Sequence, residues 1–197
     1  MIRDEQIARL MGIGALALSL GALGFQYFAH LAPCEMCHWQ RWPHIAAFLI
    51  GLVGISVWKW DSRMLVVLVV ALVIALGVII TGQWQNVFFA VIAAVLLIAA
   101  GIWEKGARSL AILTVLLVAV SGLIGAYQTG MQMGLLPGPS ACTGARFVLG
   151  SGAPPSEVSC NAVTWSLFGL SLAAYNALFS LAIAATGAFL LRRNRAA

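Results

Sequence analysis

Charged side chains are scarce in this sequence. Only 9% of the 197 residues are charged, whereas 62% are hydrophobic. A water-soluble globule of this composition lacks the polar surface that it needs to cover itself. The formal charge of +5 comes from basic residues beside hydrophobic runs, without solvated patches that alternate with aromatics, so a nucleic-acid partner is excluded. The composition predicts a single integral membrane domain over residues 1–197, surrounded by a lipid bilayer.

Six apolar runs are candidates for membrane-spanning helices. A helix of about 20 apolar residues crosses a hydrocarbon core of about 30 Å. The runs extend over Ile7 to Leu31, Pro43 to Trp58, Met64 to Ile80, Val87 to Trp103, Leu110 to Tyr127 and Trp165 to Leu191. Pro43 is expected in the first turn of its helix, where a missing N–H costs little. The predicted fold class is therefore all-α, a polytopic transmembrane helical bundle of about six spans.

Basic residues are unevenly divided between the two sides that six spans define. Nine of the 11 fall on the side of the termini: Arg3, Arg9, Lys59, Arg63, Lys105, Arg108, Arg192, Arg193 and Arg195. Only Arg41 and Arg146 fall on the other side. Because cytoplasmic loops are enriched in Lys and Arg, both termini are predicted to be cytoplasmic. All four cysteines then lie in outer loops at 32–43 and 128–164, in a compartment where disulfides persist.

The most distinctive polar motif is a pair of cysteines separated by two residues. Cys34-Glu35-Met36-Cys37 lies in the first outer loop, with His38 and Arg41 directly after it. Positive charge and a nearby helix start favour the thiolate of such a pair and make its disulfide exchangeable. A static disulfide at this spacing closes almost no loop and would stabilise little. The motif therefore favours a redox-active dithiol.

The same residues match a second pattern. Cys34-x-x-Cys37-His38 is also the spacing of c-type haem attachment, with His38 as axial ligand. Met131 or Met133 would then supply the second ligand. The first loop is short, however, and a haem leaves the other two cysteines unexplained. A membrane-anchored c-type cytochrome is therefore the alternative function.

The second outer loop contains the other two cysteines. Cys142 and Cys160 are separated by 17 residues that include Pro154-Pro155 and several glycines. The pattern is compatible with a static disulfide that orders the loop and with an exchangeable one. An extended segment of this length is ample for either cysteine to reach Cys34. Two disulfides on one face suit a relay by thiol–disulfide exchange.

Polar side chains near the first pair are candidates for contact with an electron acceptor. Arg41 is either an interfacial anchor or a cation that stabilises charge on a lipid-soluble quinone. His38, His44 and Gln40 have suitable hydrogen-bonding chemistry, although an interfacial role is the simpler interpretation of each. The candidate quinone contacts are therefore Arg41, Cys37, His38 and His44, and no metal is required. A small transporter with incidental disulfides is disfavoured, because the spans contain almost no charged residues to line a polar path.

These motifs resemble the disulfide bond formation protein B (DsbB) family. The resemblance lies in Pro33-Cys34-x-x-Cys37 with Arg41 four residues on, in the later cysteine pair, and in Trp165-Ser166-Leu167-Phe168-Gly169-Leu170. Family members usually have four spans, so residues 64–103 would be a hairpin inserted into a four-helix core. The family's frequent histidine before the second loop is replaced by Tyr127-Gln128-Thr129.

The resemblance implies a dithiol:quinone oxidoreductase of the bacterial inner membrane. Family members reoxidise the periplasmic dithiol oxidase DsbA and pass the electrons to membrane quinone, either ubiquinone or menaquinone. By position, Cys142 would form the mixed disulfide with a DsbA-like partner, and Cys160 would be its loop mate. Cys34 would exchange with Cys160. Cys37 and Arg41 would face the quinone.

Overall fold

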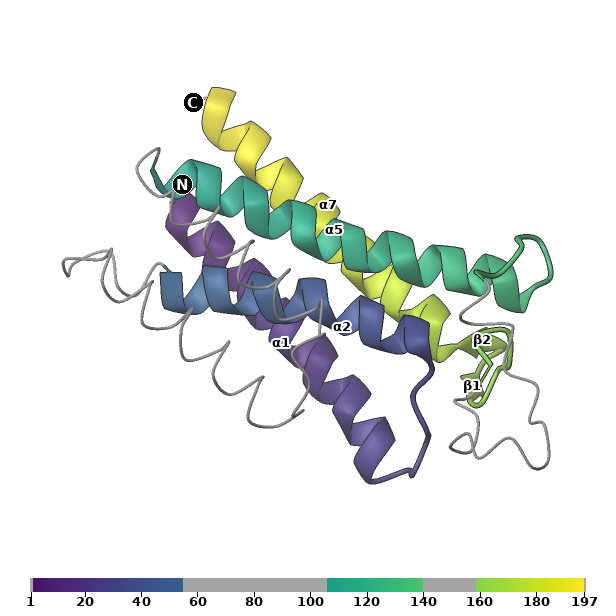
Figure 1. The fold of residues 1–197 in the computed structure, drawn as a ribbon. Helices are drawn as coiled ribbons and strands as arrows, with labels where there is room; N and C mark the ends of the chain where they lie inside the picture. The colour runs from purple at the N-terminus through teal and green to yellow at the C-terminus, as the bar shows by residue number, and fades with distance from the viewer. Residues whose placement is uncertain (1, 55–105, 140–158, 197) are drawn as a thin grey trace, which may run out of the picture.

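The fold is an antiparallel bundle of helices. The computed structural model describes residues 2–54, 106–139 and 159–196. These residues form helices α1 (Asp4–Tyr27), α2 (Glu35–Phe48), α5 (Ala107–Gln132) and α7 (Leu172–Ala196), a π-helical segment η1 (Leu49–Gly54), and strands β1 (Ser166–Leu167) and β2 (Leu170–Ser171). The helices alternate in direction, so both termini lie at one end of the bundle and the β-hairpin lies at the other (Figure 1). The predicted helical bundle is confirmed, while the proposed hairpin at 64–103 lies outside the described residues.

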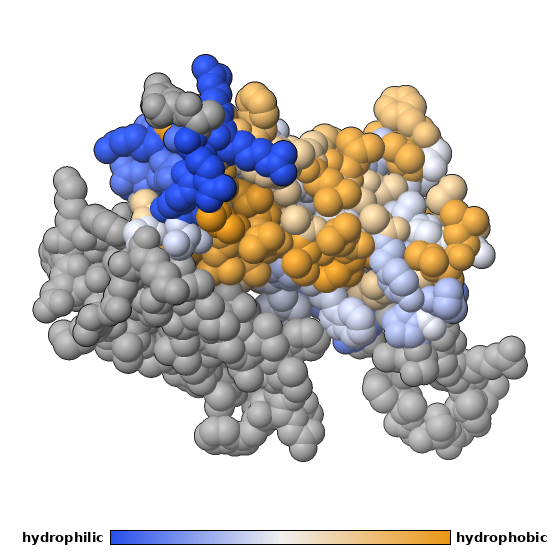
Figure 2. All heavy atoms as spheres, turned by 90° about the horizontal axis from the view of Figure 1, so that it is seen from above, coloured by the Kyte–Doolittle hydropathy of each residue, from blue (hydrophilic) through white to orange (hydrophobic). Residues whose placement is uncertain are grey.

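Three of the described helices are long and apolar enough to cross a membrane, namely α1, α5 and α7. Large apolar side chains point outward along them, including Leu20, Leu116 and Phe189, each more than half exposed. Strongly hydrophilic residues gather instead at the end that holds the termini, as Figure 2 shows. An apolar outer surface of this extent requires lipid around it. The chain is therefore an integral membrane protein.

Small residues allow the helices to pack closely. A Cβ added at Gly51 would lie 2.4 Å from the carbonyl oxygen of Ala8 and 3.0 Å from the Cα of Gly12. A Cβ added at Gly125 of α5 would lie 2.9 Å from the carbonyl oxygen of Ala173 of α7. Inside a membrane, where lipid is as apolar as leucine, such close backbone contact is a main source of helix association.

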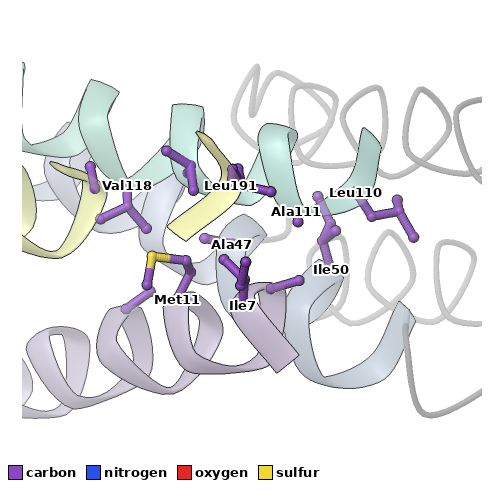
Figure 3. Close-up of a cluster of buried hydrophobic side chains, with 12 residues drawn as sticks. Ile7, Met11, Ala47, Ile50, Leu110, Ala111, Val118 and Leu191 are labelled. Atoms are coloured by element: carbon purple, nitrogen blue, oxygen red, sulfur yellow. The ribbon is translucent and has the colours of Figure 1, made fainter. Parts of the chain in front are cut away.

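One apolar cluster joins the helices toward the end that holds the termini. Side chains from α1, α2 with η1, α5 and α7 meet there (Figure 3), including Ile7, Met11, Ala47, Ile50, Leu110, Ala111, Val118 and Leu191. Polar contacts close this end, because Asn194 donates to the Ile2 carbonyl over 2.7 Å and to Asp4 Oδ1 over 2.9 Å. The cluster fixes the relative positions of the helices and thereby of the opposite end.

The second helix begins earlier than the sequence pattern predicted. It starts at Glu35, and Pro43 lies inside it instead of in its first turn. The polar stretch contains its own helix start, because Cys34 caps the helix and Glu35 places an acidic side chain in the first turn. The predicted loop at 32–43 is therefore wrong in its C-terminal part. The cysteine pair belongs to the first turn of a helix.

The boundaries around the second loop also differ from the prediction. Helix α5 continues to Gln132, so Gln128 lies within a helix. The stretch from Trp165 to Leu170 was expected to open the last span. Ser166 to Ser171 instead form a hairpin before α7. Leu167 pairs with Leu170, and the two residues between them, Phe168 and Gly169, have φ of 50° and 78°. Positive φ at both central residues matches the twist of a two-residue hairpin loop.

Candidate functional site: a dithiol beside a membrane cavity

Cys34 is both the N-cap of α2 and the first residue of the cysteine pair. Its backbone is extended, with φ −88° and ψ 169°. Its sulfur accepts a hydrogen bond from the backbone N–H of Cys37 over 3.2 Å. This bond satisfies one of the free N–H groups at the helix start. It also holds both cysteines on one turn, before the apolar part of α2, and both are free thiols.

The pKa values of the two thiols are shifted in opposite directions. A hydrogen bond from the Cys34 side chain lowers the pKa of Cys37 to about 6, with smaller contributions from Gln128 and from the positive charge of Arg41. The same hydrogen bond to Cys37, together with burial, raises the pKa of Cys34 well above its ordinary value. Cys37 is therefore the thiolate at neutral pH, and Cys34 carries the shared proton.

A third cysteine reaches this turn from the second loop. Cys160 is fully buried and packs in one cluster with Cys34, Met36 and Met131. It is disulfide-bonded. Cys142 lies outside the described residues. The structure thus brings Cys160 to Cys34, as a relay between the two loops requires.

The two methionines considered as haem ligands have different environments. Met131 is buried in the cluster with the cysteines, whereas Met133 is 69% exposed. The position of Met131 is that of an apolar packing residue, because its side chain belongs to the buried cluster.

An open cavity of about 320 Å³ lies beside the cysteine pair. Its lining includes both cysteines of the pair, Cys34 and Cys37, together with Arg41 and His44 from α2. These positions recur at helical spacing, so they share one face of α2. His38 is described but does not line the cavity. Of the four predicted quinone contacts, the structure therefore brings Cys37, Arg41 and His44 together and leaves His38 apart.

Most of the remaining cavity wall is apolar and aromatic. Phe25 of α1 packs against Trp165, with ring centroids 4.7 Å apart, and Trp165 lies 6.1 Å from Tyr175 of α7. All three residues line the cavity. The wall is thus built from two helices and from the segment that leads into the hairpin. A flat, largely apolar molecule suits such a wall.

Two buried side-chain atoms of cavity-lining residues lack hydrogen-bond partners among the described residues. Arg41 donates through Nη1 to Oε1 of Gln26 over 2.5 Å. Its buried Nε has no hydrogen-bond partner within the part of the chain that the structure describes, and the same holds for the buried Oε1 of Gln132. Both side chains line the cavity. Buried polar atoms are normally satisfied, so a donor and an acceptor are available here to a polar ligand.

A network of buried amides and hydroxyls adjoins the cysteines, and the sequence analysis did not find it. Gln128 donates through Nε2 to Cys34 Sγ over 3.2 Å and accepts at Oε1 from Gln40 Nε2. Gln40 Oε1 accepts from Asn176 Nδ2 over 2.8 Å, and Asn176 Oδ1 accepts from Ser180 Oγ over 3.1 Å. The available indication was Asn176, an amide inside the last apolar run, where polar side chains tend to be functional.

His44 connects to this network at its far end. Its Nε2 lies 3.0 Å from Ser180 Oγ, and its side chain is 2% exposed. The predicted quinone contact is therefore a buried side chain of the bundle interior that borders the cavity.

The fold and the site define a class: helical integral membrane proteins with a cysteine pair at the start of a helix beside an open cavity. The family model described as disulfide bond formation protein DsbB matches residues 4–86 and 82–190. The chain belongs to this family.

Curated relatives give the same family name over shorter segments. The chain is 43% identical over 47 residues to disulfide bond formation protein B of Psychromonas ingrahamii, which covers 24% of this chain and 25% of the relative. It is 38% identical over 73 residues to the protein of the same name from Histophilus somni, covering 37% of this chain and 39% of the relative. The chain thus spans well under half the length of these relatives. No solved structure matches it.

Proposed function

We propose that this member of the DsbB family is a dithiol:quinone oxidoreductase of the bacterial inner membrane. It would reoxidise a DsbA-like thiol oxidase in the periplasm and pass the electrons through two disulfides to membrane quinone. Family membership supports the coarser statement that the chain is a membrane protein of disulfide bond formation. The finer statement rests on the arrangement of the sulfurs.

The observation that carries the proposal is that Cys34 contacts both the loop cysteine and the cavity. On one side it packs against Cys160 in the buried cluster. On the other side it lines the cavity together with Cys37 and Arg41. A residue that adjoins both the loop cysteine and the cavity suits the transfer of reducing equivalents from one to the other.

The proposed order of exchange combines these positions with the family resemblance, which supplies the role of Cys142. Cys142 takes the partner's electrons by forming a mixed disulfide, and Cys160 is its mate in the loop disulfide. Cys160 then exchanges with Cys34, the cysteine that it contacts. Cys37 is the thiolate of the reduced pair, because its pKa is lowered to about 6. A low-pKa thiolate is a good leaving group when the Cys34–Cys37 disulfide is opened.

The cavity residues fit a quinone. Arg41, Cys37 and His44 would hold the ring between them, with the aromatic wall of Phe25 and Trp165 along its face. When bound, the quinone supplies an acceptor for two electrons and two protons. The unpartnered Nε of Arg41 would donate to a quinone oxygen, where a fixed positive charge favours the build-up of negative charge. DsbA-type proteins are strong oxidants, so a quinone is a more suitable acceptor than a thiol pool.

The experiment that tests the function is quinone reduction by the purified protein in detergent. Under anaerobic conditions, reduced DsbA-like protein is added with ubiquinone or menaquinone, and the loss of quinone absorbance is followed. Each cysteine is replaced by serine in turn. We expect bleaching by the parent protein and none by Cys37→Ser, because the Cys34–Cys37 disulfide can then no longer form and no thiolate at position 37 faces the quinone.

Unchanged turnover in Cys37→Ser would overturn the proposal. A covalent haem spectrum that survives denaturation would indicate the cytochrome alternative. Retained function in a variant with serine at all four cysteines would indicate the third class, a transporter or assembly subunit with incidental disulfides.

A further inference from the structure

Gln128 lies between the two sulfur centres that the proposed electron path connects. Its side chain is only 2% exposed on α5. Its Nε2 contacts Cys34 Sγ at 3.2 Å and the carbonyl oxygen of Cys160 at 3.5 Å. A glutamine amide carries two N–H donors, and each has a partner here. One side chain therefore contacts the capping cysteine of α2 and the segment that carries the loop cysteine.

Neighbouring amides determine which way the Gln128 amide points. Its Oε1 accepts from Gln40 Nε2, and the oxygen of Gln40 in turn accepts from Asn176. If the Gln128 amide were reversed, two N–H groups would face each other and its oxygen would face the Cys34 sulfur. Unpaired polar groups are costly in a bundle interior. The network thus keeps an N–H group directed at Cys34.

We propose that Gln128 is a catalytic residue of the internal disulfide exchange, whose side-chain N–H stabilises the negative charge that arrives on the Cys34 sulfur. The proposal rests on the proposed function, because it concerns the transfer between the two cysteine pairs. It assigns a role to Gln128, a residue to which the family resemblance gave none.

The exchange takes place in two steps. The Cys160 thiolate attacks Cys34 Sγ, so the Cys160–Cys34 bond forms, the Cys34–Cys37 bond breaks and the electron pair leaves on Cys37. The Cys142 thiolate then attacks Cys160 Sγ, so the Cys142–Cys160 bond forms, the Cys34–Cys160 bond breaks and the electron pair leaves on Cys34. One dithiol is oxidised and one disulfide is reduced. The charge reaches Cys34 in the second step, where Gln128 donates.

The hydrogen bond from Gln128 should change the balance between the two disulfide isomers in one direction, which an experiment can detect. An N–H donor lowers the free energy of a thiolate more than that of a sulfur in a disulfide, because hydrogen bonds to charged groups are stronger. Gln128 should therefore favour the state in which Cys34 is free and the loop disulfide is closed. Its removal should shift the balance back toward the Cys34–Cys160 bond.

The test isolates this second step from both quinone and partner. In a Cys37→Ser background, Cys160 forms a disulfide with either Cys34 or Cys142, and the two isomers interconvert by exchange. Their ratio is measured after acid quenching, proteolysis and mass spectrometry, in quinone-free detergent at a pH above the midpoint of Cys34 alkylation, where the released Cys34 is a thiolate. Adding Gln128→Leu should shift the ratio toward Cys34–Cys160 by about tenfold, the effect expected for one hydrogen bond to a charged group.

The matched control is Thr129→Val in the same background. Thr129 neighbours Gln128 on α5, but its hydroxyl donates to the carbonyl of Gly125 in its own helix. This variant should keep the parent ratio. A second variant, Gln128→Glu, places a carboxylate against Cys34 and should shift the ratio in the same direction as Gln128→Leu.

A second measurement separates charge stabilisation from a folding effect. The pH at which Cys34 is half alkylated by iodoacetamide should rise in Gln128→Leu and stay unchanged in Thr129→Val, both in the Cys37→Ser background. An unshifted isomer ratio in Gln128→Leu would overturn the assignment of Gln128 even if the four-cysteine protein reduces quinone. If the isomer ratio shifts but the four-cysteine protein does not reduce quinone, the role of Gln128 is supported and the proposed function is refuted.

Discussion

At the scale of residues, the site depends on an unequal pair of sulfurs. Cys34 caps a helix and keeps its proton, while Cys37 three residues later is the thiolate. The difference arises because one shared hydrogen bond stabilises the charged form of one cysteine and the neutral form of the other. This difference in pKa makes Cys37 the leaving group of the pair before any partner binds.

The acidity of Cys37 can be measured by alkylation of the reduced protein. The rate of Cys37 modification by iodoacetamide should rise with pH and reach half its maximum near pH 6, because the thiolate is the reactive form and its pKa is lowered to about 6. Cys34→Ala removes the largest cause of that shift and should move the midpoint upward. Peptide mass spectrometry reports each site, and an identical midpoint in both proteins would contradict the prediction.

The positive charge of Arg41 should matter for quinone and not for the partner. Arg41→Gln should raise the apparent KM for quinone by about tenfold, because a charge-assisted hydrogen bond is lost. The rate of disulfide exchange with reduced DsbA-like protein should be unchanged. Arg9→Gln, an exposed arginine of α1, is the matched control. Equal loss of both steps in Arg41→Gln would instead indicate a folding defect.

The sequence predicted some site residues and missed others for a physical reason. The cysteines and Arg41 were found because their chemistry is visible in the residue types and their spacing. His38 was predicted to contact the quinone because the stretch was treated as a loop, whereas the structure places it in a helix and outside the cavity lining. Gln128 was missed because the value of an amide depends on its contacts, which only the fold supplies.

At the scale of elements, backbone contacts between α1 and η1 bring two helices into unusually close packing. Gly51 in η1 lies against Ala8 and Gly12 of α1. The opposing atoms are backbone atoms, which have no flexible end that can move aside. The position of the second helix, and with it the cysteine turn, therefore depends on a residue without a side chain.

Gly51→Ala should destabilise the bundle. The added Cβ would lie 2.4 Å from the Ala8 carbonyl oxygen, so the helices must separate, at a cost of about 1–3 kcal/mol in the free energy of unfolding. The measurement is loss of helical circular dichroism on titration with SDS in mixed micelles. Gly24→Ala on α1 is the control, because a Cβ there meets nothing within 4 Å. Equal stability of the two variants would contradict the prediction.

Hydrophobic runs predicted the described helices but not their ends. The beginning of α2 and the end of α5 both lie in polar sequence, where a capping sulfur and a buried amide network stabilise the helix instead of apolar periodicity. The hairpin at Phe168 and Gly169 was missed because its residues are as apolar as those of the helix that follows.

At the scale of the whole molecule, the termini and the cysteine turn lie at opposite ends of the bundle (Figure 1). The distribution of basic residues in the sequence predicts which end faces the cytoplasm. The proposed orientation has the termini inside and both cysteine pairs in the periplasm. The donors of electrons would then approach from the compartment in which disulfides form.

This orientation is testable on intact cells. After reduction, a membrane-impermeant maleimide should label Cys37, the more exposed member of the first pair, if the first outer loop faces the periplasm. Gln6→Cys, an exposed position near the start of α1, should be labelled only after the cells are permeabilised. Labelling of Gln6→Cys in intact cells, with Cys37 labelled only after permeabilisation, would refute the orientation and the electron path with it.

Because a cysteine sulfur caps α2, the stability of the first turn of that helix should depend on the redox state of Cys34. A thiolate attracts the amide hydrogen of Cys37 more strongly than a disulfide sulfur does, so the opening turn of the helix is firmest when Cys34 bears charge. Amide protection at that turn should therefore rise and fall with each catalytic cycle. Hydrogen–deuterium exchange of the backbone amides in this turn would then report the redox state of Cys34 without any chromophore.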